Sequence, residues 1–273
     1  MKTPLRIAAV GDNCIDYFQA PPAYSVVGGN AVNVAVQLAR LGCQSFYFGA
    51  VGEDAAGSRT VALLAENGVN VQYVQSKAGK TASTQISIAS SGDRIIVDED
   101  FGTCSGYAPS ARDLAVLETM DHVHIGWLDD GGTLRRHLTE RGVSVSQDLG
   151  VNNDPAHLEP HGLTIAFGSA GENAARATQL LTAYLAAGAL NAVVTCGSAG
   201  AIAHGGDGEI RIGSRKTEVV DTTGAGDSFI AGFLVAFLHQ KDFDSCLVAG
   251  RDCAAVTCSH LGGFLQPLIA TDL

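Results

Sequence analysis

Short apolar runs alternate with helix-like segments along the chain, and this alternation predicts the fold. Residues 5–10 and 46–51 are apolar runs typical of buried strands. Between them, residues 31–41 are apolar on nearly all sides and are followed by Gly42, as expected of a buried helix with a glycine C-cap. Residues 54–67 begin at an aspartate, a favoured N-cap, and have the pattern of an amphipathic helix.

The alternation continues through the second half of the chain. The expected strands are residues 121–128, 143–148, 163–167 and 192–196 with a hairpin at about 201–215, and the expected helices are residues 132–141, 172–187, 226–238 and 243–260. Such repeated alternation implies a parallel sheet covered by helices on both faces. We therefore expect an α/β fold of three layers, with a central, mostly parallel sheet between two layers of helices.

Two stretches near the N-terminus have a different pattern. Residues 17–27 contain Pro21-Pro22 and alternating apolar residues, which is typical of an edge strand. Residues 81–89 and 94–97 flank a turn-forming Ser90-Ser91-Gly92-Asp93 and indicate a β-hairpin. The two stretches are expected to form a small strand-built flap.

We expect a single domain over residues 1–273, into which segments at about 14–27 and 81–101 are inserted as the flap. Asp98-Glu99-Asp100 are interpreted as a solvated acidic end of the hairpin rather than a metal cluster, because no calcium-loop spacing follows them.

Composition narrows the classes of partner and the location. The net charge of −11 argues against nucleic acid or an anionic membrane surface as a partner. Seven scattered cysteines without a CxxC pair indicate reduced thiols rather than disulfides or a zinc site. No signal-peptide pattern and no apolar run of membrane-spanning length is found, so we expect a cytoplasmic protein without a membrane partner.

The strongest chemical signal is Gly224-Ala225-Gly226-Asp227, which precedes the apolar helix at residues 229–238. Free backbone N–H groups and the helix dipole at this N-terminus would attract an anion such as a phosphate. A carboxylate at Asp227 is poorly placed to bind phosphate itself, but it is well placed to take a proton from a hydroxyl that attacks the phosphate. The alternative is that Asp227 only caps the helix.

A second group of candidates follows the first strand, at the sheet edge where α/β folds bind ligands. Asp12, Cys14 and Asp16 would share one side of an extended chain, so two carboxylates could face a pocket. The alternative is turn chemistry, for which Asp-Asn is common. Asn33, in the first turn of the expected buried helix, needs a partner, and a ligand hydroxyl would suit it.

Other nucleotide-binding signals are incomplete. Gly79-Lys80-Thr81 lacks the earlier glycine of a Walker A loop. Phe229 stands where a dinucleotide fingerprint needs its third glycine, which disfavours a dehydrogenase. His122 and His124 alternate on an expected strand and are interpreted as core or pocket lining, because no third metal ligand is suitably spaced.

Two glycine-led segments together resemble one known family. Residues 28–35, Gly-Gly-Asn-Ala-Val-Asn-Val-Ala, with Gly42 and Gly52 after them, resemble the N-terminal signature of the ribokinase (PfkB) carbohydrate kinases. Residues 221–227, Asp-Thr-Thr-Gly-Ala-Gly-Asp, resemble the C-terminal signature of that family. The resemblance covers essentially the whole chain and implies a ribokinase-like fold, with the flap segments as its lid.

The resemblance also implies roles for individual residues. Asp227 would be the catalytic base and Gly224, Ala225 and Gly226 the anion hole. The substrate contacts would be Asp16, Gly29 and Asn33, and the nucleotide contacts Ser169, Glu172, Thr195, Gly197 and Gly200. Asp12, Gly28 and Asn30, which lie beside these substrate positions in the sequence, are further candidates for substrate binding. Glu172 would bind Mg²⁺ indirectly, with Ser169 in place of the asparagine usual in this family. Asp221 and Thr223 match positions near a monovalent-cation site, which K⁺ would occupy.

These features together indicate an ATP- and Mg²⁺-dependent phosphotransferase that acts on a hydroxyl of a small sugar or sugar-amine. Residues 11–16 and the Gly-Gly-Asn-Ala segment most resemble family members that phosphorylate fructoselysine at its 6-hydroxyl. A nucleoside or other ketose kinase, and a non-catalytic sugar- or nucleotide-binding regulator, remain as alternatives. A homodimer formed through the lid is a further expectation.

Overall fold

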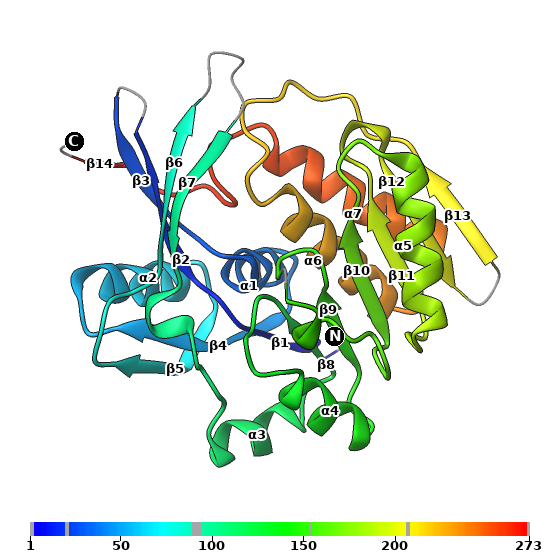
Figure 1. Cartoon of the computed structure of the whole chain (residues 1–273), viewed down its shortest axis with the longest axis horizontal. Helices are drawn as coiled ribbons and strands as arrows, with labels where there is room; N and C mark the ends of the chain where they lie inside the picture. Colours follow the sequence, from blue (N-terminus) through cyan, green and yellow to red (C-terminus); the bar gives the residue numbers. More distant parts are fainter. Residues whose placement is uncertain (1–2, 20–21, 89–93, 153, 206–207, 272–273) are drawn as a thin grey trace.

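Nine strands form a central sheet through the computed structural model, which describes residues 3–19, 22–88, 94–152, 154–205 and 208–271 (Figure 1). Their order is β13-β12-β11-β10-β9-β8-β1-β4-β5. The strands are β1 (Arg6–Val10), β4 (Gln44–Gly52), β5 (Asn70–Lys77), β8 (His122–Ile125), β9 (Val145–Asp148), β10 (Ile165–Ser169), β11 (Ala192–Thr195), β12 (Ala201–Gly205) and β13 (Gly208–Ile212). Neighbours from β11 to β5 are parallel, and only the β11–β12–β13 pairings are antiparallel.

Helices cover both faces of this sheet, which confirms the expected three-layer architecture. The helices are α1 (Asn30–Arg40), α2 (Ala55–Glu66), α3 (Ala111–Leu117), α4 (Thr133–Glu140), α5 (Ala174–Ala186), α6 (Ala225–Leu238) and α7 (Phe243–Thr257), with short 3₁₀ turns η1 (Gly102–Cys104), η2 (Pro155–His157) and η3 (Gly197–Ala199). Ile7 and Ala9 of β1 pack with α1, α2, α6 and α7, whereas Ala8 and Val10 pack with α3 and α4. Both faces of β1 are therefore buried, as its continuous apolar sequence requires.

A second, smaller sheet stands beside the first (Figure 1). It contains β2 (Cys14–Phe18), β3 (Tyr24–Gly28), β6 (Ser83–Ile88), β7 (Arg94–Asp100) and β14 (Ile269–Ala270), in the order β14-β3-β2-β6-β7. Four of these strands come from the segments in which the sequence predicts the flap, and we call this second sheet the lid. The turn expected at Ser90-Ser91-Gly92-Asp93 and the proline at position 21 lie outside the described residues.

The fifth lid strand comes from the C-terminus and was not expected from the sequence. β14 pairs with Tyr24 and Ser25 of β3. Before β14, the Gln266 side-chain amide pairs with the backbone of β3 as a neighbouring strand would. It accepts a hydrogen bond from the Val27 N–H and donates one to the Val27 carbonyl, both at 2.8 Å. The C-terminal segment thus fixes the lid to the main domain at the base of β3.

One local expectation needs correction, and two elements were not expected. Asp98-Glu99-Asp100 do not follow a strand but are the last residues of β7. Strand β5 and helix α3 were not predicted from the sequence. His122 and His124 do lie in the core, where both rings share the Ser146 hydroxyl at 2.8–2.9 Å, and burial lowers the pKa of each to about 3.

Candidate active site

The N-terminus of α6 is shaped by two glycines with different roles. Gly224 is the N-cap and has a left-handed φ of 71°, and a Cβ on it would lie 2.4 Å from the Gly263 Cα. A Cβ on Gly226 would meet no neighbouring atom within 4 Å. Gly224 is therefore required by backbone conformation and packing, whereas Gly226 leaves open space in front of the first-turn amides, where an anion would bind.

Asp227 lies in the first turn of α6, but it does not cap the helix. The N-cap position belongs to Gly224, and the two carboxylate oxygens of Asp227 accept hydrogen bonds from another helix. Asn30 Nδ2 donates to Oδ1 and Asn33 Nδ2 donates to Oδ2, each at 2.7 Å. Asn30 and Asn33 are three residues apart on α1, so their side chains share one face and reach the same carboxylate.

A second carboxylate, Asp148 at the end of β9, shares this arrangement. Asn30 Nδ2 also donates to Asp148 Oδ2 at 3.0 Å, and the Gly150 N–H donates to Asp148 Oδ1 at 2.9 Å. Burial raises the pKa of Asp148 to about 6. Burial likewise raises the pKa of Asp227 well above its ordinary value, and the charges of Asp148 and Asp12 raise it further, although the amide hydrogen bonds act in the opposite direction. Asp227 therefore has a raised proton affinity, as a general base requires.

Asp12 and Asp16 do not face one pocket side by side, because the extended chain is interrupted between β1 and β2. Asp12 instead binds the start of α1: Oδ2 accepts from the Asn30 N–H at 2.8 Å, and Oδ1 accepts from the Ala31 N–H at 3.2 Å and the Trp127 N–H at 3.3 Å. The contacts of the Asp12 carboxylate are thus those of a residue that caps a turn and the start of a helix, which agrees with the alternative interpretation of Asp12 as a turn residue. Asp16 is buried on β2 and accepts a hydrogen bond from the Cys14 thiol at 3.1 Å.

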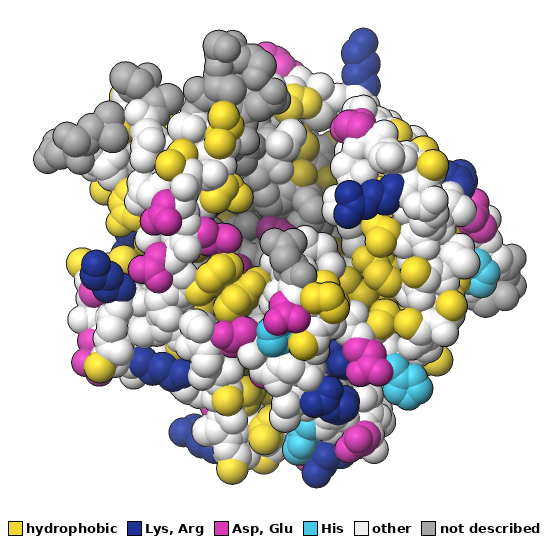
Figure 2. Space-filling view, viewed as in Figure 1, with side chains coloured by type: hydrophobic (Ala, Val, Ile, Leu, Met, Phe, Trp, Pro, Cys, Tyr) yellow, Lys and Arg dark blue, Asp and Glu magenta, His cyan; other side chains and the backbone are white. Residues whose placement is uncertain are grey.

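Three polar side chains form a row across the lid sheet. Asp16 on β2 pairs with Thr84 on β6, and Thr84 pairs with Glu99 on β7, so the three side chains lie on the same face. Partial burial raises the pKa of Glu99, and the charge of Asp12 adds to this rise. In Figure 2 acidic side chains gather along the lid side of a hollow between the lid and the other half of the molecule. The lid therefore adds negative charge to the ligand-facing side of the site.

Gly28 and Gly29 place the lid strand close to the start of α1. A Cβ on Gly28 would lie 2.6 Å from Asp16 Oδ2, and one on Gly29 would lie 2.6 Å from the Asn13 Cα. These glycines therefore allow β3 and the loop after β1 to pack closely around the expected substrate contacts.

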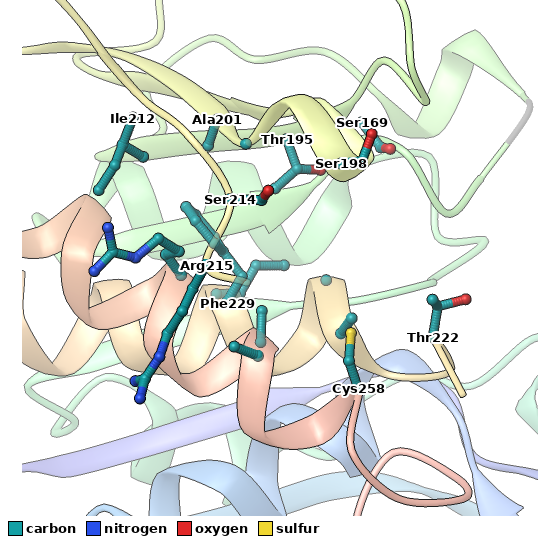
Figure 3. A pocket seen from close by; sticks show the side chains of 18 of the residues that line it. Ser169, Thr195, Ser198, Ala201, Ile212, Ser214, Arg215, Thr222, Phe229 and Cys258 are labelled. Atoms are coloured by element: carbon teal, nitrogen blue, oxygen red, sulfur yellow. The ribbon is translucent and has the colours of Figure 1, made fainter. Parts of the chain in front are cut away.

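A cavity of about 560 Å³ opens on the other side of the α6 N-terminus (Figure 3). Its walls include Ser169, Thr195 and Ser198 at one end, Thr222 below them, and Phe229, Ile212 and Arg215 toward the other end. Gly226 also lines it. Among the expected nucleotide contacts, Ser169, Glu172, Thr195, Gly197 and Gly200 all line this cavity, as does Asp148.

Two segments of the cavity wall are connected through Glu172. Its two carboxylate oxygens accept hydrogen bonds from the Ser198 N–H at 2.9 Å and the Ser198 hydroxyl at 2.6 Å, and these bonds lower the pKa of Glu172. Gly197 must be glycine here, because it has a φ of 50° and a Cβ would clash with the Glu172 carboxylate. The Ser169–Glu172 and Thr195–Gly200 segments are thus held together as one wall.

Asp221 connects the loop before α6 to the C-terminal segment. Its Oδ1 accepts from the Thr223 N–H at 2.8 Å and the Thr223 hydroxyl at 2.9 Å, and its Oδ2 accepts from the Gly262 N–H at 2.8 Å. The loop that leads into Gly224 is therefore fixed to the C-terminal segment.

Comparison with known proteins agrees with this geometry. Residues 22–140 and 154–267 match the sequence model of the family described as pfkB family carbohydrate kinase. The chain belongs to the pfkB family of carbohydrate kinases. Fructoselysine 6-kinase of Escherichia coli (strain K12) is 36% identical over 268 residues, which cover 97% of this chain and 100% of that protein. Fructosamine kinase FrlD of Bacillus subtilis (strain 168) is 32% identical over 269 residues, which cover 95% and 93%.

A solved structure shows the same fold in another carbohydrate kinase. The ribokinase of Arabidopsis thaliana, complexed with ribose and ATP, superimposes with a TM-score of 0.85 over 95% of this chain and 94% of its own, at 23% identity. The expected ribokinase-like fold is thereby confirmed, as is the expectation that the chain is a carbohydrate kinase.

Two acidic residues of this carbohydrate kinase were missed in the sequence. Asp148 is the last residue of a parallel strand, at the edge of the sheet where α/β folds bind ligands. Asp12 follows another strand at the same edge, so this shared position could have identified Asp148 as a site residue. Glu99 was interpreted only as part of a solvated end; the strand pairing that aligns it with Asp16 is not visible in the sequence.

Proposed function

We propose that the chain transfers the γ-phosphoryl group of ATP to a hydroxyl of a sugar–amine conjugate of the fructosamine class, with fructoselysine and its 6-hydroxyl as the first candidates. The observation that carries the proposal is Asp227. Its carboxylate is held by two asparagine amides on the side of α1 and lies one residue from Gly226, which opens onto the cavity. A base and an anion-binding helix terminus are thus adjacent, as in-line phosphoryl transfer requires.

In this mechanism Asp227 takes the proton of the attacking hydroxyl, whose oxygen forms the new bond to the γ-phosphorus. The bond from that phosphorus to the β–γ bridging oxygen breaks, and ADP leaves with the electron pair. Backbone N–H groups at the start of α6 would stabilise the charge that develops on the phosphoryl oxygens. Asp227 then carries the proton until product release.

The nucleotide is assigned to the cavity lined by Ser169, Glu172, Thr195, Gly197 and Gly200. The apolar side chains of Ile212 and Phe229 offer surfaces for the adenine ring of the nucleotide. They lie at the end of the cavity distant from Ser169 and Thr222 (Figure 3). The sugar is assigned to the side of Asp227 that faces α1 and the lid, near Asp16 and Asn33.

The residues present fit the cations that the family implies. Oxygen donors suit Mg²⁺, and Glu172 offers a carboxylate on the cavity wall that would hold the ion through water. Bound Mg²⁺ would neutralise the charge of the polyphosphate. Asp221 and Thr223 offer carboxylate and hydroxyl oxygens for K⁺ beside the anion-hole loop.

The acidic lining of the lid supports a cationic substrate. The charge of Asp12 raises the pKa of Glu99, so the two carboxylates lie close enough to interact beside the expected sugar position. A protonated amine would relieve their repulsion, whereas a neutral ketose would not. The names of the two relatives, a fructoselysine 6-kinase and a fructosamine kinase, point to the same substrate class.

A panel of acceptors tests the proposed function. With Mg²⁺ and ATP, we expect the highest kcat/KM for fructoselysine, a lower value for fructose and the lowest for ribose and adenosine. Phosphorus NMR of the product would identify the phosphorylated hydroxyl. A wild-type enzyme that prefers fructose or adenosine would contradict the fructosamine assignment, and the absence of turnover with every acceptor would favour a binding regulator.

Glu99 is expected to contribute to this preference. Glu99→Gln should reduce the ratio of kcat/KM for fructoselysine to that for fructose by about two- to fivefold, the value of a partly exposed ion pair. The effect should be larger at low salt, because screening is weaker there. The measurement is the ratio itself, since a general loss of activity cancels in it.

Asp98 provides the matched control. It is the preceding residue on β7 and pairs with Gln85, so its side chain points to the opposite face of the lid. Asp98→Asn should leave the ratio unchanged. An unchanged ratio in Glu99→Gln as well would remove Glu99 from the specificity argument. Asp12→Asn is a less direct test, because the Asp12 oxygens accept backbone N–H groups of α1.

We further propose a homodimer formed through the lid. β7 is the last strand in the lid order, and Ile95, Ile96 and Val97 on it are 51–62% exposed. A second β7 would bury this apolar edge. The molar mass in solution should then be twice 28.1 kDa, and Ile96→Lys should reduce it to that of one chain. A wild-type mass of one chain at assay concentration would contradict the dimer.

The proposed location is the cytoplasm. The seven cysteines are scattered and include no CxxC pair, a pattern typical of reduced thiols in a reducing compartment. No helix in the described ranges combines the length and the apolar character that crossing a membrane requires.

A further inference from the structure

One amide group connects two carboxylates in the interior of the site. Asn30 Nδ2 lies 2.7 Å from Asp227 Oδ1 and 3.0 Å from Asp148 Oδ2. Asn30 is 7% exposed and Asp148 is 9% exposed, so the hydrogen bond between them is not readily replaced by one to water. An amide nitrogen carries two N–H groups, and each is directed at one carboxylate.

The two carboxylates also determine how the amide is oriented. The Asn30 Oδ1 is buried without a hydrogen-bond partner in the part of the chain that the structure describes. Rotating the amide by half a turn would place that oxygen against two carboxylate oxygens and would lose both hydrogen bonds. Asn30 is thus held by its two acceptors, Asp148 and Asp227.

We propose that Asp148 and Asn30 act together as positioning residues for the reaction: the Asp148 carboxylate orients the Asn30 amide, and that amide holds the Asp227 carboxylate toward the attacking hydroxyl. This inference rests on the proposed function, because it takes Asp227 as the base of a phosphoryl transfer. It also assigns to Asn30 a role in orienting the base, which differs from the substrate contact expected from the sequence.

The same arrangement determines when the base is ionised. The groups that face Asp227 are Asn30 and Asn33 from α1, Asp148 from β9 and Asp12 from the segment after β1. Within the described residues no lysine or arginine forms an ion pair with Asp12, Asp148 or Asp227. The Asp148 charge therefore acts on Asp227 without a neutralising partner and raises its proton affinity, while the Asn30 amide stabilises the ionised form.

The opposite signs of these two effects give the test. Activity requires ionised Asp227, so kcat/KM falls as the pH falls through the pKa of this group. Asp148→Asn removes a like charge and should move this acid limb to lower pH by about one unit. Asn30→Ala removes a hydrogen bond to the ionised form and should move the limb to higher pH by a similar amount. Both profiles are measured with fructoselysine at saturating Mg²⁺ and ATP.

Asp244→Asn, an exposed aspartate in the first turn of α7, is the control and should leave the limb in place. The inference would be overturned if the acid limb of kcat/KM lay at the wild-type pH in both variants, however much kcat fell. Asp148 and Asn30 would then have a structural role only. Shifts in the same direction would also overturn the inference. If thermal melting shows that either variant is misfolded, Asp148→Ser and Asn30→Ser take their places. A wild-type enzyme without turnover would instead contradict the proposed function.

Discussion

Replacing Asp227 by asparagine is expected to lower kcat by about 100- to 10,000-fold, the usual contribution of a general base, while the protein remains folded. Asparagine has the same shape but cannot take the proton of the attacking hydroxyl. One of its two polar atoms can still accept a hydrogen bond from α1, so we expect ATP affinity and the melting temperature to change little. The measurement is single-turnover phosphorylation of fructoselysine, together with Tm and the Kd for ATP.

The matched control for this prediction is Asp242. It is the N-cap of α7 and accepts a hydrogen bond from the Ser245 N–H at 2.7 Å, which is the capping role that the sequence left open for Asp227. Asp242→Asn should keep the wild-type kcat, because asparagine is an equally good N-cap. If Asp227→Asn also kept it, Asp227 would not be the base.

The layered architecture was accessible from the sequence because local patterns determine it. The continuous apolar sequence of β1 and the apolar α1 with Gly42 after it require burial on all sides, and only a sheet covered on both faces supplies this. Strand β5 was overlooked although Val71 and Tyr73 alternate with polar residues, as in an edge strand. β14 contains only two residues and exists because β3 offers it an edge, so no local pattern could have indicated it.

The candidate site was predictable to the extent that it depends on motifs. The resemblance placed Asp227 beside the anion hole, and the need of Asn33 for a polar partner was visible from its position in a buried helix. The partner itself, the Asp227 carboxylate, was not. It follows from the packing of α1 against α6, which brings together residues 194 positions apart. The role of Asp148 depends on the same packing.

Asp12 shows how a correct position can be given an incomplete role. Its place after the first strand was predicted, but the direction of its carboxylate is determined by three backbone N–H groups from α1 and the Trp127 loop. Once these are satisfied, Asp12 influences the site mainly through its charge, which raises the pKa of Glu99 and of Asp227.

The second prediction with a large expected effect concerns Gly226. Gly226→Val should lower kcat about 100-fold or more and leave the Kd for the sugar nearly unchanged. The side chain would occupy the open space in front of the first-turn amides and keep the phosphoryl group away from them, and loss of such donors typically costs two to three orders of magnitude. The fold should tolerate the change, because a Cβ here meets no neighbouring atom within 4 Å.

Gly224 distinguishes this effect from a general defect. Gly224→Ala places a Cβ 2.4 Å from the Gly263 Cα at a φ of 71°, so it should lower the melting temperature, whereas Gly226→Val should not. Calorimetric sugar binding and kcat are compared for both variants. Equal losses of sugar affinity and kcat in Gly226→Val would mean that the substitution distorts α6 and, with it, the Asp227 carboxylate. A loss confined to kcat, with Tm preserved, would place the phosphoryl group directly in front of Gly226, between the nucleotide cavity and the base.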